Sequence, residues 1–234
     1  MPDLPATIAS RLSNAFGPAA DADRAAGARS YMRGQFEFYG IAAPGQRAIW
    51  RDATSDLPPP NERELVRVAN TCWAEPQREW QYFACGYLRR HAPGKSSRLL
   101  PAVGKLIRTK SWWDTVDSLA AHTVGTIVAE HPEIASTMDE WSRSSDIWIA
   151  RTAILHQLGY KSRTDSDRLF AYCLARAGDK EFFIRKAIGW ALREYSKTNE
   201  RAVRAFVHEH EDTLAPLSRV EALKWLNRRA ARGI

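Results

Sequence analysis

Aromatic residues that open helical segments recur along this chain at a nearly constant interval, and this spacing constrains the fold more than any other feature. The intervals are 33, 35 and 35 residues, between Trp80, Trp113, Trp148 and Phe183. Segments 147–154 (IWIARTAI) and 182–189 (FFIRKAIG) also align at an offset of 35, with aromatic, isoleucine and basic positions in register. A period in the mid-thirties is typical of stacked two-helix repeats. The spacing therefore predicts an α-solenoid of HEAT-like repeats, whose concave face is the usual binding surface.

The rest of the sequence also favours an all-α chain. Apolar residues return at three- and four-residue spacing in several segments, among them 62–73, 79–90, 167–178 and 220–229. Short breakers separate these segments, and we find no convincing alternating pattern of a strand. The triple proline at 58–60 indicates a connection between an N-terminal helical cap, residues 1–57, and regular helical repeats over residues 61–230. We therefore expect a single HEAT-like repeat domain over residues 1–234.

Positive charge is concentrated in the C-terminal part of the chain. The 234 residues carry a net charge of +7, of which residues 1–144 contribute +1 and residues 145–234 contribute +6. A basic half points weakly to a nucleic acid partner, although ordinary solvated helix faces would give the same balance. We expect the concave face of the repeats to be basic.

Several classes of protein are excluded by motifs that the sequence lacks. No apolar run is long enough to span a bilayer, and the first residues do not have the pattern of a signal peptide. Walker, dinucleotide-binding and zinc-binding patterns are absent, so we expect no cofactor and no metal. The three cysteines, Cys72, Cys85 and Cys173, lack metal spacing and are expected to be buried small hydrophobes. These observations predict a cytoplasmic protein that makes no membrane contact.

The segment 111–120 is expected to form a helix that carries the first candidate site residues. Ser111 and Asp114 have the spacing of a capping box, which would begin the helix and occupy the Asp114 carboxylate. Trp113 and Asp117, four residues apart, would stack one turn over the other. A carboxylate beside an indole points to a functional site, although a half-buried tryptophan and a solvated aspartate would also fit a structural helix.

Arg151 lies in the apolar face of the helix that is expected over residues 146–158. A buried guanidinium without a partner is very costly, so a carboxylate from a neighbouring helix must meet it. Asp117 is the acid of the neighbouring repeat that the expected cap does not use. We therefore predict an ion pair between Arg151 and Asp117, which would keep Asp117 ionised and fix its rotamer. A purely structural ion pair is the alternative.

A third helix, expected over residues 180–197, has two different faces. One is an apolar core stripe, and on the opposite side four residues align within about 60°, namely Lys186, Trp190, Arg193 and Lys197. A tryptophan that lies between cations and points away from the core suits contact with sugars or bases flanked by phosphate contacts. A protein–protein hot spot would use the same residue types. We favour nucleic acid because the C-terminal part of the chain is basic.

Four motifs resemble those of the AlkD-like DNA alkylation repair glycosylases, which are built from HEAT-like repeats. They are segments 31–41 (YMRGQFEFYGI), 110–117 (KSWWDTVD), 151–155 (RTAIL) and 184–195 (IRKAIGWALREY). The resemblance extends over residues 20–230, nearly the whole chain. It implies that Asp117 is the catalytic carboxylate, that Trp113 and Trp190 are the aromatic walls of the site, and that Arg151 is the basic partner of Asp117.

The resemblance also implies a reaction and a partner. Family members excise cationic alkylpurines such as 3-methyladenine and 7-methylguanine from duplex DNA. Tyr31 would contact the DNA near the lesion, and Lys186, Arg193 and Lys197 would add phosphate contacts. Since the sequence suggests no catalytic lysine, we expect simple hydrolysis by a monomeric, bacterial, nucleoid-associated enzyme. The alternative is a non-catalytic helical-repeat scaffold that binds DNA or protein.

Overall fold

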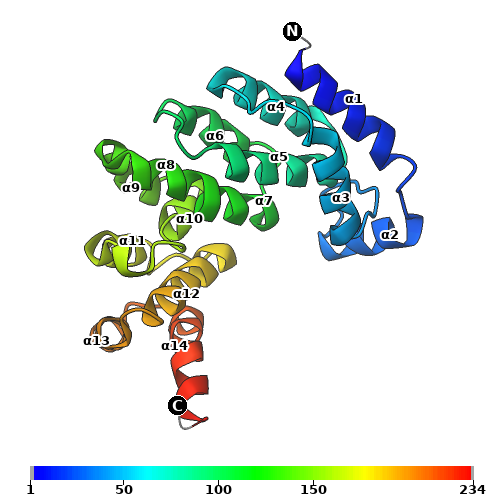
Figure 1. Ribbon diagram of the computed structural model, residues 1–234. Helices are drawn as coiled ribbons and strands as arrows, with labels where there is room; N and C mark the ends of the chain where they lie inside the picture. Colours follow the sequence, from blue (N-terminus) through cyan, green and yellow to red (C-terminus); the bar gives the residue numbers. More distant parts are fainter. Residues whose placement is uncertain (1–2, 233–234) are drawn as a thin grey trace. The chain divides into compact units, whose positions relative to one another are not determined.

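The computed structural model describes residues 3–232, and these residues form helices and connecting loops with no strand among them (Figure 1). The prediction of an all-α chain is confirmed. The helices group into two compact units, one up to Ala102 and the other from Val103, and the boundary falls inside helix α6 (Leu99–Arg108). The division between a cap and regular repeats near residue 57 stays a prediction.

The first unit is built around the packing of its earliest helices on one another. Its helices are α1 (Leu4–Phe16), α2 (Ala22–Tyr31), α3 (Ala43–Thr54), α4 (Glu62–Ala74) and α5 (Arg78–His91). Helix α1 packs against α3 and α4, and α5 packs against both of these. The buried ring of Phe16 meets that of Trp80 edge-on at 5.2 Å. The triple proline lies in the connection between α3 and α4.

A buried carboxylate shapes the loop before α3. The Glu79 side chain accepts the backbone N–H groups of Tyr39 at 3.0 Å, Gly40 at 2.8 Å and Ile41 at 3.3 Å. Gly40 has φ +83°, a conformation that residues with a Cβ rarely adopt. The glycine therefore allows three successive N–H groups to turn toward one acid.

The second unit contains the helices in which the sequence period was found. In chain order they are α7 (Trp113–Ser118), the π-helical turn η1 (Leu119–Val124), α8 (Gly125–Glu130), the 3₁₀ turn η2 (Pro132–Ile134), α9 (Ala135–Ser142), α10 (Ile147–Leu155), the 3₁₀ turn η3 (Lys161–Arg163), α11 (Ser166–Ala175), α12 (Phe182–Ser196), α13 (Glu200–Glu209) and α14 (Pro216–Ala230).

These helices form repeats of two. We call α7, α10, α12 and α14 the leading helices, because each opens a repeat; they begin at residues 113, 147, 182 and 216. Each leading helix packs on the next one, α7 on α10, α10 on α12 and α12 on α14. The trailing helices α9, α11 and α13 lie along the left of this unit in Figure 1. The predicted repeat of about 35 residues is thus present in the second unit.

Side-chain caps explain where several of these helices begin. Asp146 precedes α10 and accepts the backbone N–H groups of Trp148 at 2.9 Å and Ile149 at 3.4 Å. Asp165 caps α11 and Asn199 caps α13 in the same way. Each cap satisfies backbone donors that the first helical turn leaves unpaired.

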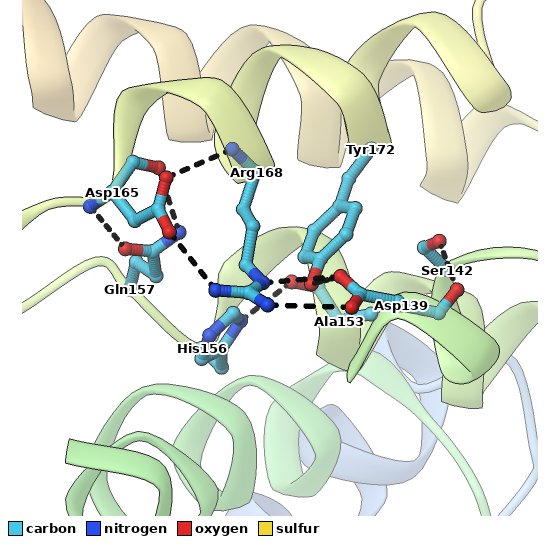
Figure 2. A network of polar contacts seen from close by, with 8 residues as sticks. All are labelled: Asp139, Ser142, Ala153, His156, Gln157, Asp165, Arg168 and Tyr172. Atoms are coloured by element: carbon cyan, nitrogen blue, oxygen red, sulfur yellow. Dashed lines mark hydrogen bonds and ion pairs between the residues drawn. The ribbon is translucent and has the colours of Figure 1, made fainter. Parts of the chain in front are cut away.

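A polar network joins the trailing helices α9 and α11 (Figure 2). Asp139 of α9 accepts hydrogen bonds from Arg168 at 3.1 Å and from the Tyr172 hydroxyl at 2.6 Å, both from α11. Arg168 also reaches Asp165, the cap of its own helix, at 3.1 Å. We call these contacts the trailing network.

Candidate functional site

The start of α7 differs from the prediction. The residue before the helix is Trp112, with extended backbone and no capping side-chain hydrogen bond. Ser111 lies one position too early to cap, and its Oγ donates instead to the carbonyl oxygen of Ile107 at 2.6 Å. The Asp114 carboxylate accepts the backbone N–H of the next residue at 2.9 Å. The predicted capping box of Ser111 and Asp114 is therefore wrong, because the helix begins later than the box requires.

The predicted ion pair between Arg151 and Asp117 is confirmed. The Nε atom of Arg151 lies 2.7 Å from Oδ1 of Asp117, and Nη2 lies 2.8 Å from Oδ2. The Arg151 side chain is only 5% exposed and that of Asp117 is 14% exposed. Arg151 also donates through Nη1 to the carbonyl oxygen of Phe183. One guanidinium thus connects the leading helices α7, α10 and α12.

Burial and pairing act on Asp117 in opposite directions. Desolvation raises the pKa of Asp117 above its ordinary value, while the hydrogen bonds and charge of Arg151 lower it. Both carboxylate oxygens accept hydrogen bonds from the guanidinium of Arg151. The arrangement is therefore that of a carboxylate with a fixed orientation.

Asp117 and Trp190 line the same cavity, which has a volume of about 260 Å³. Trp190 reaches it from α12, and Asp117 reaches it from α7. Three polar side chains that no sequence pattern predicted also line this cavity, namely Ser118, His122 and Glu194. The structure thus brings together three of the four residues expected in the site, Asp117, Arg151 and Trp190.

The π-helical turn η1 explains why α-helical spacing did not predict His122 as a residue of the cavity. On a regular α-helix, His122 would lie about 140° from Asp117, on a different face. A π-helical turn closes i→i+5 hydrogen bonds, so residues five apart lie nearly one above the other, and such turns are frequent at functional sites. Because η1 follows α7 directly, His122 lines the cavity of Asp117.

Trp148 and Phe183, at equivalent positions of two repeats, pack on each other and on Trp112, the neighbour of the predicted Trp113. The rings of Trp148 and Phe183 have centroids 5.0 Å apart, and Trp112 contacts both, at 5.7 and 5.1 Å. Trp112 therefore contributes to the aromatic stack at the start of α7. Trp113, the first residue of α7, is half-buried and lies one turn before Asp117.

Lys186 and Arg193 of α12 are held by one carboxylate, that of Glu221 in α14. Lys186 Nζ lies 2.9 Å from Oε1 of Glu221, and Arg193 pairs with Oε2 of the same residue. The expectation that this face of α12 points away from the packing is corrected in part, because α14 packs on α12 and carries Glu221. Lys197 is exposed and lies 2.6 Å from Glu194.

Glu221 is strongly acidic in this setting. The hydrogen bond from Lys186 lowers the pKa of Glu221 to about 2, with a further contribution from Lys224 at 3.3 Å and against the effect of desolvation. A neighbouring carboxylate 35 residues after Lys186 repeats the period of the leading helices. That spacing is the signal by which the sequence could have revealed Glu221.

Tyr31, the remaining candidate, ends α2 in the first unit and is 72% exposed. It lines a cavity of about 340 Å³ together with Arg24 and Gln46. An exposed tyrosine with a polar tip beside a cavity is suited to contact a large partner.

Other features of the described residues bear on the class of the protein. Within residues 3–232, no group of three or more His, Cys, Asp or Glu side chains could hold a metal ion. Among the helices of that range, none combines the length and the apolar composition needed to cross a membrane. All three cysteines are buried, as predicted. The fold and the site define an all-α repeat protein with an acidic, tryptophan-lined cavity.

Comparison with known proteins gives the family. Residues 12–226 match the family described as "DNA alkylation repair enzyme", and the chain belongs to this family. A solved structure described as a "predicted DNA alkylation repair enzyme" from Enterococcus faecalis is similar, with 31% sequence identity and a TM-score of 0.82. The similarity covers 88% of this chain and 96% of that one. No curated protein matches the chain. The suspected resemblance to DNA alkylation repair proteins is confirmed at the level of the family.

Proposed function

We propose that this protein is a monofunctional DNA glycosylase that hydrolyses the N-glycosidic bond of cationic alkylpurines, of the 3-methyladenine and 7-methylguanine class, in duplex DNA. Its membership of a family of DNA alkylation repair enzymes supports a repair reaction. The observation that carries the proposal is the buried Asp117–Arg151 pair at a cavity that Trp190 also lines.

The chemistry requires little more than a well-placed negative charge. Alkylation of a ring nitrogen makes the purine a cation, so it leaves as a neutral base with the electron pair of the C1′–N bond. Positive charge then develops on the sugar, and an ionised Asp117 stabilises it electrostatically. Water adds to C1′, its proton passes to solvent, and an abasic site remains. Because the base leaves neutral, no general acid is needed.

The pairing with Arg151 determines the chemical role of Asp117. Both carboxylate oxygens are engaged by the guanidinium, so Asp117 serves as a fixed negative charge that also positions water, rather than as a nucleophile. Trp190, and Trp113 one turn before Asp117, would contact the lesion nucleotide. Each indole face adds a cation–π attraction of roughly 0.5–2 kcal/mol to a cationic base or sugar. Among the described residues, no lysine lines the cavity of Asp117, which supports hydrolysis without strand cleavage.

Contacts to the DNA backbone are assigned to the cations of the second unit, and a contact to the DNA near the lesion is assigned to Tyr31. Lys186, Arg193 and Lys197 retain partly exposed side chains, at 36%, 25% and 42%. The net charge of +6 over residues 145–234 supports binding to a polyanion through the basic concave face that we expect. One repeat protein along one duplex is consistent with a monomer.

Single-turnover release of 7-methylguanine from duplex DNA tests the proposal. We expect release by the wild type and at least a 100-fold lower rate for Asp117→Asn, since a preorganised charge at the transition state contributes effects of about this size. DNA affinity should persist in the variant. Asp139→Asn is the matched control, because Asp139 also pairs with an arginine but belongs to the trailing network. If the wild type releases base no faster than the spontaneous rate, and the wild type and Asp117→Asn both bind DNA in a salt-sensitive way, the protein is a non-catalytic scaffold.

A further inference from the structure

Four charged residues occupy equivalent positions in the four leading helices. They are Asp117 in α7, Arg151 in α10, Lys186 in α12 and Glu221 in α14, separated by 34, 35 and 35 residues. The first two form the ion pair of the candidate site, and the last two form a second pair at 2.9 Å. The second pair therefore repeats the first in register, with the order of the charges reversed.

A glycine allows Glu221 to sit between two cations of α12. A Cβ atom at Gly189 would lie 2.5 Å from the Cβ of Glu221 and 2.8 Å from the carbonyl oxygen of Ser218, so only glycine permits this approach of α14. Lys186 precedes Gly189 by about one helical turn, and Arg193 follows it by about one turn. Glu221 accepts one cation on each of its carboxylate oxygens.

The carboxylate is buried, while the cations reach the surface. Glu221 is 8% exposed. Lys186 and Arg193 are more exposed, and each keeps N–H groups beyond the one that Glu221 accepts, since an ammonium has three and a guanidinium five. With Lys224 as a third cation at 3.3 Å, the cluster carries a surplus of positive charge. Trp190, next to Gly189, lines the cavity of Asp117.

We propose that Glu221 is a positioning residue, which holds Lys186 and Arg193 so that their remaining N–H groups bind the DNA phosphates that flank the nucleotide at Trp190. This inference rests on the proposed function. Free lysine and arginine side chains lose considerable rotamer entropy when they bind, and a partner that fixes them beforehand removes part of that cost. Glu221 thus lowers the net positive charge of the cluster around Lys186 and Arg193. It also fixes the positions at which these two cations bind phosphates.

The test compares Glu221→Gln with two other variants. Gln keeps the volume of Glu221 and removes its charge. Glu200→Gln is the matched control, since Glu200 of α13 pairs with Arg204 at 2.8 Å and the same charge is lost elsewhere. Glu221→Asp retains the charge and tests rescue. Two quantities are measured: the single-turnover release of 7-methylguanine, and the preference in Kd for a duplex with a tetrahydrofuran abasic-site analogue over an undamaged duplex.

If Glu221 positions the two cations, its substitution should lower specificity for the damaged site but not affinity for undamaged duplex. In Glu221→Gln, affinity for undamaged duplex should stay equal or rise, because a negative charge is gone. The release rate and the preference for the analogue should each fall about tenfold, because the phosphates no longer hold the nucleotide in register. Glu200→Gln should keep both within about twofold of the wild type, and Glu221→Asp should recover part of the loss.

The outcomes separate this inference from the proposed function. If Glu221→Gln and Glu200→Gln have the same release rate and the same preference for the analogue, the role of Glu221 is refuted. The proposed glycosylase activity is not affected by that result. A wild type that releases no base but prefers the analogue, with the preference lost in Glu221→Gln, would refute the glycosylase and support the role of Glu221. A wild type with neither release nor preference would refute both.

Discussion

The second unit contains two arginine–aspartate pairs of similar chemistry in very different surroundings. Arg151 and Asp117 join leading helices, with side chains 5% and 14% exposed. Arg168 and Asp139 belong to the trailing network, with side chains 40% and 36% exposed (Figure 2). Their contacts are 2.7 and 2.8 Å in the first pair but 3.1 and 3.4 Å in the second.

The pKa values of the two aspartates shift in opposite directions. Desolvation raises the pKa of Asp117 despite its arginine. For Asp139 desolvation is again the largest single effect and raises the pKa. The hydrogen bonds from Tyr172 and Arg168 and the charges of Arg168 and Arg143 together outweigh it, so that the pKa lies below its ordinary value. Burial, rather than the presence of an arginine, therefore decides the direction of the shift. A buried pair fixes a charge in place at a cost, whereas a half-exposed pair mainly joins helices.

Removing the arginine of each pair should give the largest difference in stability. Arg151→Met leaves a carboxylate buried without its partner, and we expect it to lower the free energy of unfolding by about 3–5 kcal/mol. Arg168→Met should cost about 1 kcal/mol or less, because Asp139 can be solvated. Urea denaturation at pH 7 measures both.

A double variant sharpens this result. Arg151→Met combined with Asp117→Asn removes both charges and should recover much of the loss in stability, although not the activity. Equal losses for the two single arginine variants would contradict the distinction between the pairs.

A buried histidine beside the trailing network should make the stability depend on pH. Burial lowers the pKa of His156 to about 4, with Arg168 acting in the same direction, while its hydrogen bond with the Ala153 carbonyl and the charges of Asp139 and Asp165 oppose the shift. The unfolded chain binds the proton near pH 6.5, so acid favours unfolding. The stability that comes from neutral His156 is complete above pH 6.5 and is lost as the pH falls to about 4, by roughly 3 kcal/mol.

His156→Gln checks the assignment of that pH dependence. Denaturation midpoints between pH 4 and pH 7 should change less in this variant than in the wild type, whatever its stability at pH 7. A variant with an unchanged slope would show that other groups bind the protons.

A small effect, comparable to that of Arg168→Met, is expected at Tyr172. Tyr172→Phe removes one hydrogen bond of 2.6 Å to a partly solvated carboxylate, and it should lower the free energy of unfolding by about 1 kcal/mol. The pKa of Asp139, followed by NMR titration, should rise toward its ordinary value. Base release should stay at the wild-type rate, and a large decrease would mean that the trailing network affects the site.

The sequence predicted the features that follow from a strong physical requirement. A period shared by several aromatic residues predicted the two-helix repeat. A guanidinium in an apolar face needed a carboxylate, and Asp117 was the suitable acid of the neighbouring repeat. Trp190 was predicted as a site residue from its position between cations, and the structure brings it to the cavity of Asp117.

Other features depend on geometry that sequence patterns do not encode. The capping box failed because Ser111 closes α6 instead of opening α7. The place of His122 depends on a π-helical turn, which has no signature in residue spacing. The role of Glu221 depends on how closely α14 approaches Gly189, and a helical projection of α12 alone cannot show that approach.

The register of charges in the leading helices limits how this array could change in length. Along α7, α10, α12 and α14 the order is acid, base, base, acid. Duplication of the repeat that begins with α10 would bury a second guanidinium with no carboxylate left to receive it, at a cost of several kcal/mol. Deletion of the same repeat would instead bring Lys186 between Asp117 and Glu221, and every cation would keep an acid. The electrostatics of this fold thus allow a shorter array more readily than a longer one.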